Sequence, residues 1–158
     1  MKESFLAIIL VGMTLIILGC SEHTASEIEG DQPPIPSVSF EEDPIPVTRA
    51  SYCWTNGCVD YAGPPEILEG VTPFIVPLGA ELTIEFVDYE PLPSSISMSF
   101  MQEGKKEWDS VEFDVRDGML KVPAFPGIYY YDFIAVWTSE ETGYGLGDSY
   151  YAFVIEVE

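Results

Sequence analysis

Basic residues are scarce in this chain of 158 residues, where six Lys and Arg stand against 27 Asp and Glu for a formal net charge of −21. Such a negative field repels the phosphates of nucleic acid and of anionic lipid headgroups, so we expect neither as a partner. It attracts cations and basic polypeptides instead.

Histidine is scarcer still, since His23 is the only one. Nucleophilic catalysis of the usual kind needs a base beside the nucleophile, and the segment from residue 47 onward holds no histidine and only five basic residues. Paired carboxylates of the glycosidase kind are the catalytic alternative that so acidic a chain leaves open. We therefore expect a protein that is not an enzyme.

The chain also lacks an apolar run long enough to cross a membrane. The longest, residues 5–18, would rise about 21 Å as a helix against a hydrocarbon core of about 30 Å. Such a length is typical of the hydrophobic part of a signal peptide. We therefore expect an export signal over residues 1–19, with an uncleaved anchor as the alternative.

The run ends in Ile17-Leu18-Gly19-Cys20, which resembles the lipobox of bacterial lipoproteins. Leu18 departs from the pattern, because a small residue is commoner at that position. The resemblance implies cleavage before Cys20, a lipid on Cys20, and attachment to the extracytoplasmic face of the cell membrane. An ordinary, non-lipidated signal peptide is the competing interpretation.

Residues 21–46 contain no basic residue but seven acidic ones and five prolines. Like charges and low apolar content oppose folding, and the prolines favour extended polyproline geometry. We predict a disordered acidic tether over residues 20–46 that holds a domain away from the membrane. Fully extended at about 3.1 Å per residue, it would reach roughly 80 Å.

From residue 47 onward, short alternating segments separated by Gly and Pro predict an all-β domain. Residues 82–86, 96–100 and 111–115 alternate apolar and polar side chains, as half-buried strands do. Asp117-Gly118 predicts a turn that leads back into residues 119–122. Residues 64–70 can form one helical turn at most.

The two longest predicted strands, 127–137 and 150–158, are joined through the polar loop 138–148. This pattern is typical of the last hairpin of a β-sandwich. Pro126-Gly127-Ile128-Tyr129 resembles the start of the penultimate strand in immunoglobulin-like domains, and that resemblance implies a bond from the Tyr129 hydroxyl to backbone a few residues upstream. Tyr131 stands where antibody domains keep a cysteine, which excludes their inter-sheet disulfide.

The resemblance implies an immunoglobulin-like antiparallel β-sandwich of about seven or eight strands over residues 47–158. The whole chain is similar to small uncharacterised lipoproteins of Gram-positive bacteria that carry such a domain. That group supplies no mechanism to carry over.

Cys53 and Cys58 flank the tight-turn pair Asn56-Gly57. A four-residue loop would place the two cysteines opposite each other within disulfide reach, whereas a strict two-residue turn would pair Thr55 with Cys58. An exported chain meets an oxidising compartment, so we expect a disulfide. The spacing is not Cys-x-x-Cys, and no third ligand accompanies the pair, which argues against redox activity and metal binding.

The loop 138–148 is our candidate partner-binding surface, because it presents Glu140, Glu141 and Tyr144 among glycines. Loops on rigid sandwiches commonly bind partners, and the acidic field favours a basic protein or a cationic cell-wall component. Trp54 is either a packed cap over the end of the sandwich, which we favour, or an exposed aromatic anchor for a partner. The three glycines of the loop lack the strand-to-helix context of a phosphate-binding loop.

Glu140, Glu141 and Asp148 are also weak calcium candidates, together with Asp88 and Glu90 on an earlier loop. No continuous ligand motif of the EF-hand kind is present. We expect no cofactor, with calcium as the open exception.

Taken together, these features predict a monomeric, non-catalytic binding module anchored to the membrane. One alternative is an inhibitor or modulator of a secreted enzyme. Another is a passive acidic protein that associates with the cell wall or binds cations.

Overall fold

The computed structural model describes residues 27–158, and within them it contains eleven strands and one helical turn. The predicted signal peptide and Cys20 lie outside the described residues, as does His23. The elements are β1 (Ser37–Phe40), β2 (Asp43–Ile45), β3 (Thr48–Trp54), β4 (Gly57–Val59), α2 (Pro64–Ile67), β5 (Phe74–Val76), β6 (Glu81–Glu85), β7 (Ser95–Gln102), β8 (Asp109–Val111), β9 (Met119–Lys121), β10 (Gly127–Thr138) and β11 (Gly145–Val157).

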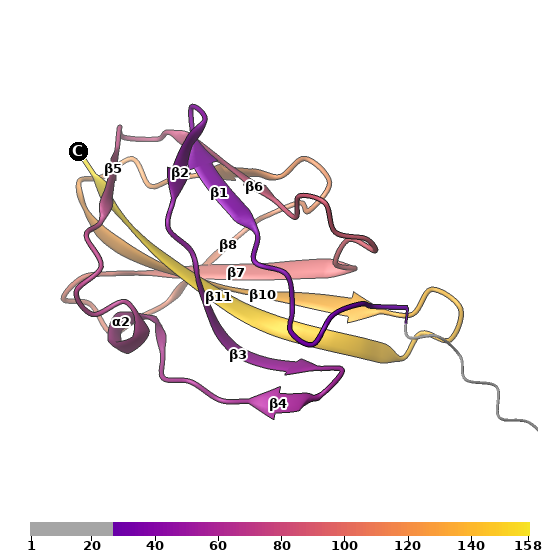
Figure 1. The fold of residues 1–158 in the computed structure, drawn as a ribbon. Helices are drawn as coiled ribbons and strands as arrows, with labels where there is room; N and C mark the ends of the chain where they lie inside the picture. The colour runs from indigo at the N-terminus through magenta and orange to yellow at the C-terminus, as the bar shows by residue number, and fades with distance from the viewer. Residues whose placement is uncertain (1–26) are drawn as a thin grey trace, which may run out of the picture.

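The strands form two sheets, which confirms the predicted β-sandwich (Figure 1). The smaller sheet has the order β2-β1-β6-β9, and the larger one has the order β4-β3-β11-β10-β7-β8. Neighbours in these orders are antiparallel, but β5 lies parallel to the last residues of β11. The strand count exceeds the expected seven or eight because many strands are only three residues long and two lie before residue 47.

The long hairpin β10–β11 is the centre of the fold, and its register runs from Gly127–Val157 to Thr138–Gly145. Successive side chains of a strand point to opposite faces, so every second residue enters the core. Both strands turn one face into the core. The buried residues on these faces are Tyr129, Tyr131, Phe133, Ala135, Trp137, Tyr151, Phe153, Ile155 and Val157.

The Tyr129 hydroxyl donates a hydrogen bond to the carbonyl of Phe125, at 3.0 Å, as the resemblance to the penultimate strand implied. Two residues further along, Tyr131 is fully buried and stacks on Phe153, with 4.7 Å between the ring centroids. Its hydroxyl has no hydrogen-bond partner within residues 27–158, and burial raises its pKa well above the usual value. Because Tyr131 and Phe153 are register partners on β10 and β11, this stack covers the core-facing side of the larger sheet.

The predicted boundary between tether and domain is wrong, because the fold includes residues 27–46. Strand β1 pairs with both β2 and β6, and Ile28, Val38 and Ile45 are buried in the core. The acidic and proline residues dominate the composition of this segment, but its few apolar residues are spaced to fill one face of the smaller sheet. Pro44 fits because β2 is an edge strand, where a missing N–H donor is tolerated.

The predicted hairpin over residues 111–122 is also wrong. β8 ends at Val111 and pairs with β7 in the larger sheet, whereas β9 pairs with β6 in the smaller one. Residues 112–118 therefore cross from one sheet to the other. The crossing is fixed at Gly118, which has φ +66° and accepts a 2.8 Å hydrogen bond from the Ile84 N–H.

Candidate functional site

The hairpin of β3 and β4 carries a disulfide between Cys53 and Cys58, as predicted. The two cysteines lie directly opposite each other, with 4.0 Å between their Cα atoms. The next pair toward the tip is Trp54 and Gly57, so the turn lies on Thr55-Asn56, one residue earlier than the Asn-Gly pattern indicated. Gly57 adopts φ +118°, which explains the glycine at this position.

The tip of this hairpin holds residues 29–31, and we call these contacts the N-terminal clamp. Three consecutive residues of the hairpin tip each donate one side-chain hydrogen bond to the segment that precedes β1. The bonds run from Trp54 Nε1 to the Glu29 carbonyl (3.3 Å), from Thr55 Oγ1 to the Gly30 carbonyl (2.8 Å), and from Asn56 Nδ2 to Asp31 Oδ1 (2.9 Å).

Trp54 is a packed cap and not an exposed anchor, since only 6% of its surface is accessible. Its ring meets Trp137 edge-on at a centroid distance of 5.0 Å and contacts Tyr89 at 6.3 Å. Gly147 permits this packing, because a Cβ at that position would lie 2.6 Å from the indole. We therefore remove Trp54 from the predicted partner-binding set.

Two tyrosine hydroxyls and one arginine also hold this N-terminal segment. The Tyr89 hydroxyl exchanges two 3.2 Å hydrogen bonds with the backbone of Glu29. The Tyr151 hydroxyl donates to the Pro34 carbonyl at 2.6 Å, and the Arg49 guanidinium donates to the Pro33 carbonyl at 2.6 Å. The carbonyl groups of Glu29, Gly30, Pro33 and Pro34 are thus bound to the body of the sandwich.

The β10–β11 connection is shorter than predicted, because β11 begins at Gly145. Its ends are tied by a 2.9 Å hydrogen bond from the Ser139 N–H to the Tyr144 carbonyl. The Ser139 hydroxyl accepts a bond from the Thr142 N–H and donates one to the Glu27 carboxylate at 2.5 Å. The start of the described chain therefore lies against the tip of the longest hairpin.

The structure does not assemble the calcium candidates of this loop. Asp148 belongs to β11, where it lies opposite Val136 and Cys53, whereas Glu140 and Glu141 are exposed on the loop. In the part of the chain that the structure describes, no group of three or more acidic, cysteine or histidine side chains could hold a metal ion. Oxygen-rich coordination of calcium needs more ligands than these positions bring together.

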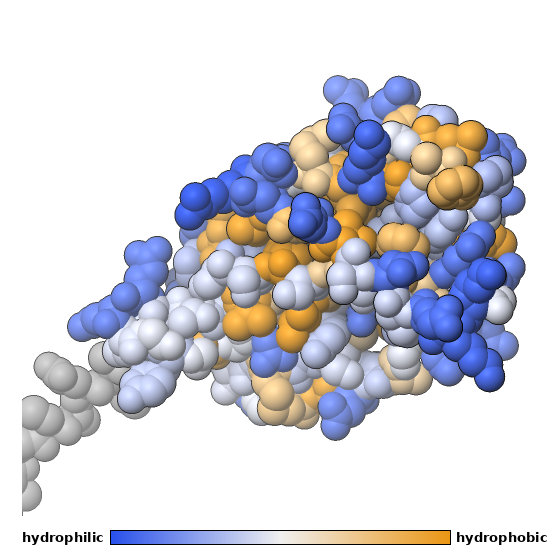
Figure 2. Space-filling model, turned by 180° about the vertical axis from the view of Figure 1, so that it is seen from behind, coloured by the Kyte–Doolittle hydropathy of each residue, from blue (hydrophilic) through white to orange (hydrophobic). Residues whose placement is uncertain are grey.

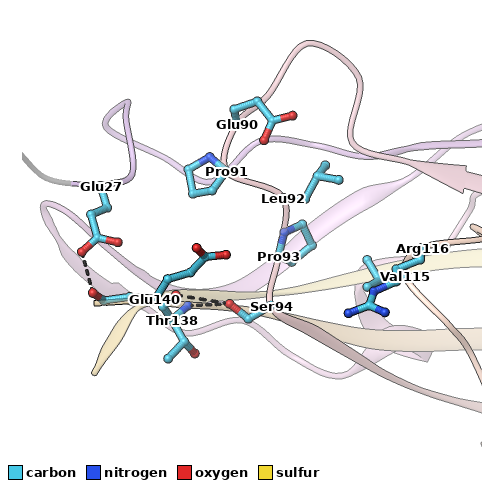
Figure 3. A pocket seen from close by; sticks show the side chains of 11 residues that line it. Glu27, Glu90, Pro91, Leu92, Pro93, Ser94, Val115, Arg116, Thr138 and Glu140 are labelled. Carbon is cyan, nitrogen blue, oxygen red and sulfur yellow. Dashed lines mark hydrogen bonds between the residues drawn. The ribbon is translucent and has the colours of Figure 1, made fainter. Parts of the chain in front are cut away.

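A hollow of about 860 Å³ lies at this end of the sandwich, where three loops converge. They are the β6–β7 connection, the β8–β9 crossing and the start of the β10–β11 loop. Figure 3 shows Glu27 and Glu140 at one end of the hollow and Arg116 at the other, with the Pro91–Pro93 segment between them.

A second hollow of about 360 Å³ shares Leu92, Val115 and Arg116 with the first, and its other apolar walls include Phe86 and Ile96. We call the two hollows together the end groove. Leu92, which lies between two prolines, is 49% exposed. Seen from behind, apolar surface in the middle of the molecule is bordered by strongly hydrophilic side chains (Figure 2).

Charge around the end groove is unbalanced, because Arg116 is its only basic side chain. The groove therefore combines an apolar floor with a rim that favours positive groups. Five carboxylates line the two hollows: Glu27, Glu85, Glu90, Asp117 and Glu140.

The groove contains only part of the predicted site. Glu140 lines it, together with Glu90 from the earlier loop, but Glu141 and Tyr144 do not. Tyr144 is 77% exposed on the β10–β11 loop. Sequence reasoning missed Leu92 and Arg116; an apolar residue between two prolines was the available indication of an exposed apolar position.

No helix within residues 27–158 is both long enough and apolar enough to cross a membrane. The chain matches no protein-family model, curated protein or solved structure with which we compared it.

Proposed function

We propose that this protein is a non-catalytic binding module, held on the extracytoplasmic face of the cell membrane by a lipid on Cys20. Its end groove would bind a segment of another polypeptide that carries both basic and apolar side chains. The observation that carries this proposal is the combination of exposed apolar walls with five carboxylates and a single arginine.

The two components of the groove support different parts of binding. Burying one large aliphatic side chain against Leu92 or Val115 would contribute about 1.5–3 kcal/mol. The carboxylates would accelerate association with a basic partner and disfavour acidic ones. A net charge of −21 over the whole chain acts in the same direction.

The anchor supports a location close to the membrane. The Glu27 carboxylate accepts a hydrogen bond from Ser139 on the body of the sandwich, and residues 21–26 separate Glu27 from Cys20 in the sequence. Six residues span at most about 22 Å, far less than the roughly 80 Å expected for a tether that ran to residue 46. Because Glu27 itself lines the groove, we infer that the groove faces the membrane and meets a membrane protein or a component at the cell surface.

Site-specific photo-crosslinking on intact cells tests this proposal. A photoreactive residue at Val87, which is 60% exposed in the groove, should give a discrete crosslinked product identifiable by mass spectrometry. The matched position is Ile75 on β5, which is 56% exposed and not among the residues that line the groove. Equal labelling from both positions would reject the groove as the binding surface.

Two further variants separate the parts of the proposal. Replacing Glu90 and Glu140 together by Gln should weaken the Val87 crosslink, more strongly in low salt than in high salt. Cys20→Ala should leave the protein at its unprocessed size, because a lipobox cysteine receives its lipid before the signal peptide is cleaved. If the alanine variant stays in the membrane fraction at the processed size, the lipid anchor is rejected while the groove is not.

A further inference from the structure

A smaller hollow of about 140 Å³ lies on the outer face of the larger sheet. It is formed by the segment before α2 together with β3, β10 and β11, and none of its residues lines the end groove. Figure 1 shows α2 beside the same strands. The lining residues are Ala50, Ser51, Tyr61, Ala62, Gly63, Pro64, Asp132 and Tyr150.

Asp132 is the only charged residue of this hollow. Its neighbours Tyr131 and Phe133 point into the core, so the Asp132 side chain points outward. The carboxylate is half-buried, and that burial raises its pKa above 3.8. The charge is therefore partly desolvated, and no side-chain hydrogen bond to it is found within residues 27–158.

Two tyrosines line the hollow with Asp132. Tyr150 lies two residues before Ala152, the partner of Asp132 on β11, and so shares its face of the sheet. Tyr61 is held in place by its N–H, which donates a 2.9 Å hydrogen bond to the Ser51 hydroxyl. More than half of the Tyr61 side chain remains accessible.

We propose that this hollow binds an alkylammonium group. A carboxylate supplies the opposite charge and a hydrogen-bond acceptor, and tyrosine faces attract a cation through the ring quadrupole. A single carboxylate is a poor metal site, because divalent cations need several oxygen ligands. Pockets for whole small molecules occupy about 300–1,000 Å³, so the hollow suits the end of an amine chain and not a large ligand.

The amine can be a lysine side chain of a polypeptide or a free organic amine. The site is independent of the proposed function, because it lies on a different surface and requires neither the groove nor the lipid anchor. A test on the purified chain in solution can therefore fail without contradicting the crosslinking experiments, and the reverse also holds.

The test is a titration with n-butylammonium, followed by NMR signals of the Tyr61 and Tyr150 rings and of the Asp132 carboxyl. Binding should shift these signals saturably and lower the pKa of Asp132, since a nearby positive charge favours the carboxylate. Asp132→Asn should weaken binding by about tenfold or more, because hydrogen bonds to charged groups are the stronger ones. Tyr61→Leu should weaken it by a few-fold.

Glu69→Gln is the matched control, because it removes one exposed negative charge just after α2 and should leave the affinity within about twofold. Butan-1-ol is the neutral ligand control and should not bind. A lysine-containing peptide that binds at least tenfold tighter than n-butylammonium would identify a polypeptide as the source of the amine, whereas equal affinities would indicate a free amine.

The proposal is overturned if wild type and Asp132→Asn bind n-butylammonium equally, or if wild type shows no saturable shift. Folding does not confound the comparison, because Asn is close to Asp in shape and removes only the desolvated charge. A thermal unfolding curve for each variant verifies this point.

Discussion

Two regions at the same end of the sandwich are built in opposite ways. In the N-terminal clamp, the indole of Trp54 is buried and the hairpin tip donates a hydrogen bond from each of three consecutive residues. In the end groove, Leu92 and Val87 stay exposed, and the carboxylates of the rim outnumber the single arginine. The difference indicates that the clamp maintains the fold, and it leaves the groove free for the binding role that we propose.

The largest expected effect is a loss of stability in Trp54→Ala. Truncating this packed aromatic should lower the free energy of unfolding by about 3–5 kcal/mol, which urea denaturation measures as a lower midpoint at constant slope. Leu92→Ala in the groove should change it by no more than about 0.5 kcal/mol. Equal losses would remove the distinction between the two regions.

Gly147→Ala should be the next most damaging change, at about 3 kcal/mol, near the upper end of the range for overpacking. A Cβ would meet the Trp54 ring at 2.6 Å, and that ring is held in place by Trp137 and the Glu29 carbonyl. Gly145→Ala is the matched control, because a Cβ there meets nothing within 4 Å. If both variants unfold at the same urea concentration, the close approach at Gly147 is not important.

Replacing both Cys53 and Cys58 by Ser should cost about 2 kcal/mol, because the disulfide closes only a short loop. The loss should be accompanied by faster hydrogen exchange at residues 29–31, since the loosened hairpin carries the donors that hold them. Reduction of the wild type should reproduce both changes. Unchanged exchange at residues 29–31 would show that the clamp does not depend on the disulfide.

The smallest expected effect is a gain in stability in Asp132→Asn, whereas the preceding substitutions lower the stability. Burial raises the pKa of this carboxyl above 3.8, so the folded state binds its proton more tightly than the unfolded state does. The wild type therefore loses stability, relative to Asp132→Asn, as the pH rises from 3.8 through the folded-state pKa. At pH 7 the variant should melt slightly higher, and below pH 3.8 the difference should disappear; a variant that melts lower at pH 7 would contradict this.

The sequence was most informative where the alternation of inward and outward side chains extends over a long segment. The alternation in β10 and β11 extends over many residues, and an inward face that carries Trp137, Phe133 and Phe153 can be satisfied only by a buried sheet surface. The disulfide between Cys53 and Cys58 was also predictable, because a four-residue loop between them places them opposite each other, although the Asn-Gly pattern alone indicated a turn one residue later. These features required no knowledge of distant contacts.

The predictions that were wrong share a physical cause. Whether a residue is buried depends on which other part of the chain covers it. Val38 and Ile45 occur among acidic residues and prolines, and they are buried only because β1 pairs with β6, far along the chain. Val111 and Val115 alternate like a strand, but Val111 ends a strand of the larger sheet and Val115 lies in the crossing that leads to the smaller one. The end groove was not predictable for the same reason, since three separate loops bring Leu92, Val115 and Glu140 together.

The clamp also affects how the domain responds to force. A pull applied at Glu27 is first resisted by the Ser139 hydroxyl, and then by the hairpin tip and the hydroxyls of Tyr89 and Tyr151, before β1 can be stripped from β6. The covalent link between Cys53 and Cys58 prevents the hairpin from unzipping under that tension. A domain attached through its N-terminal side should therefore keep its fold under shear at a cell surface.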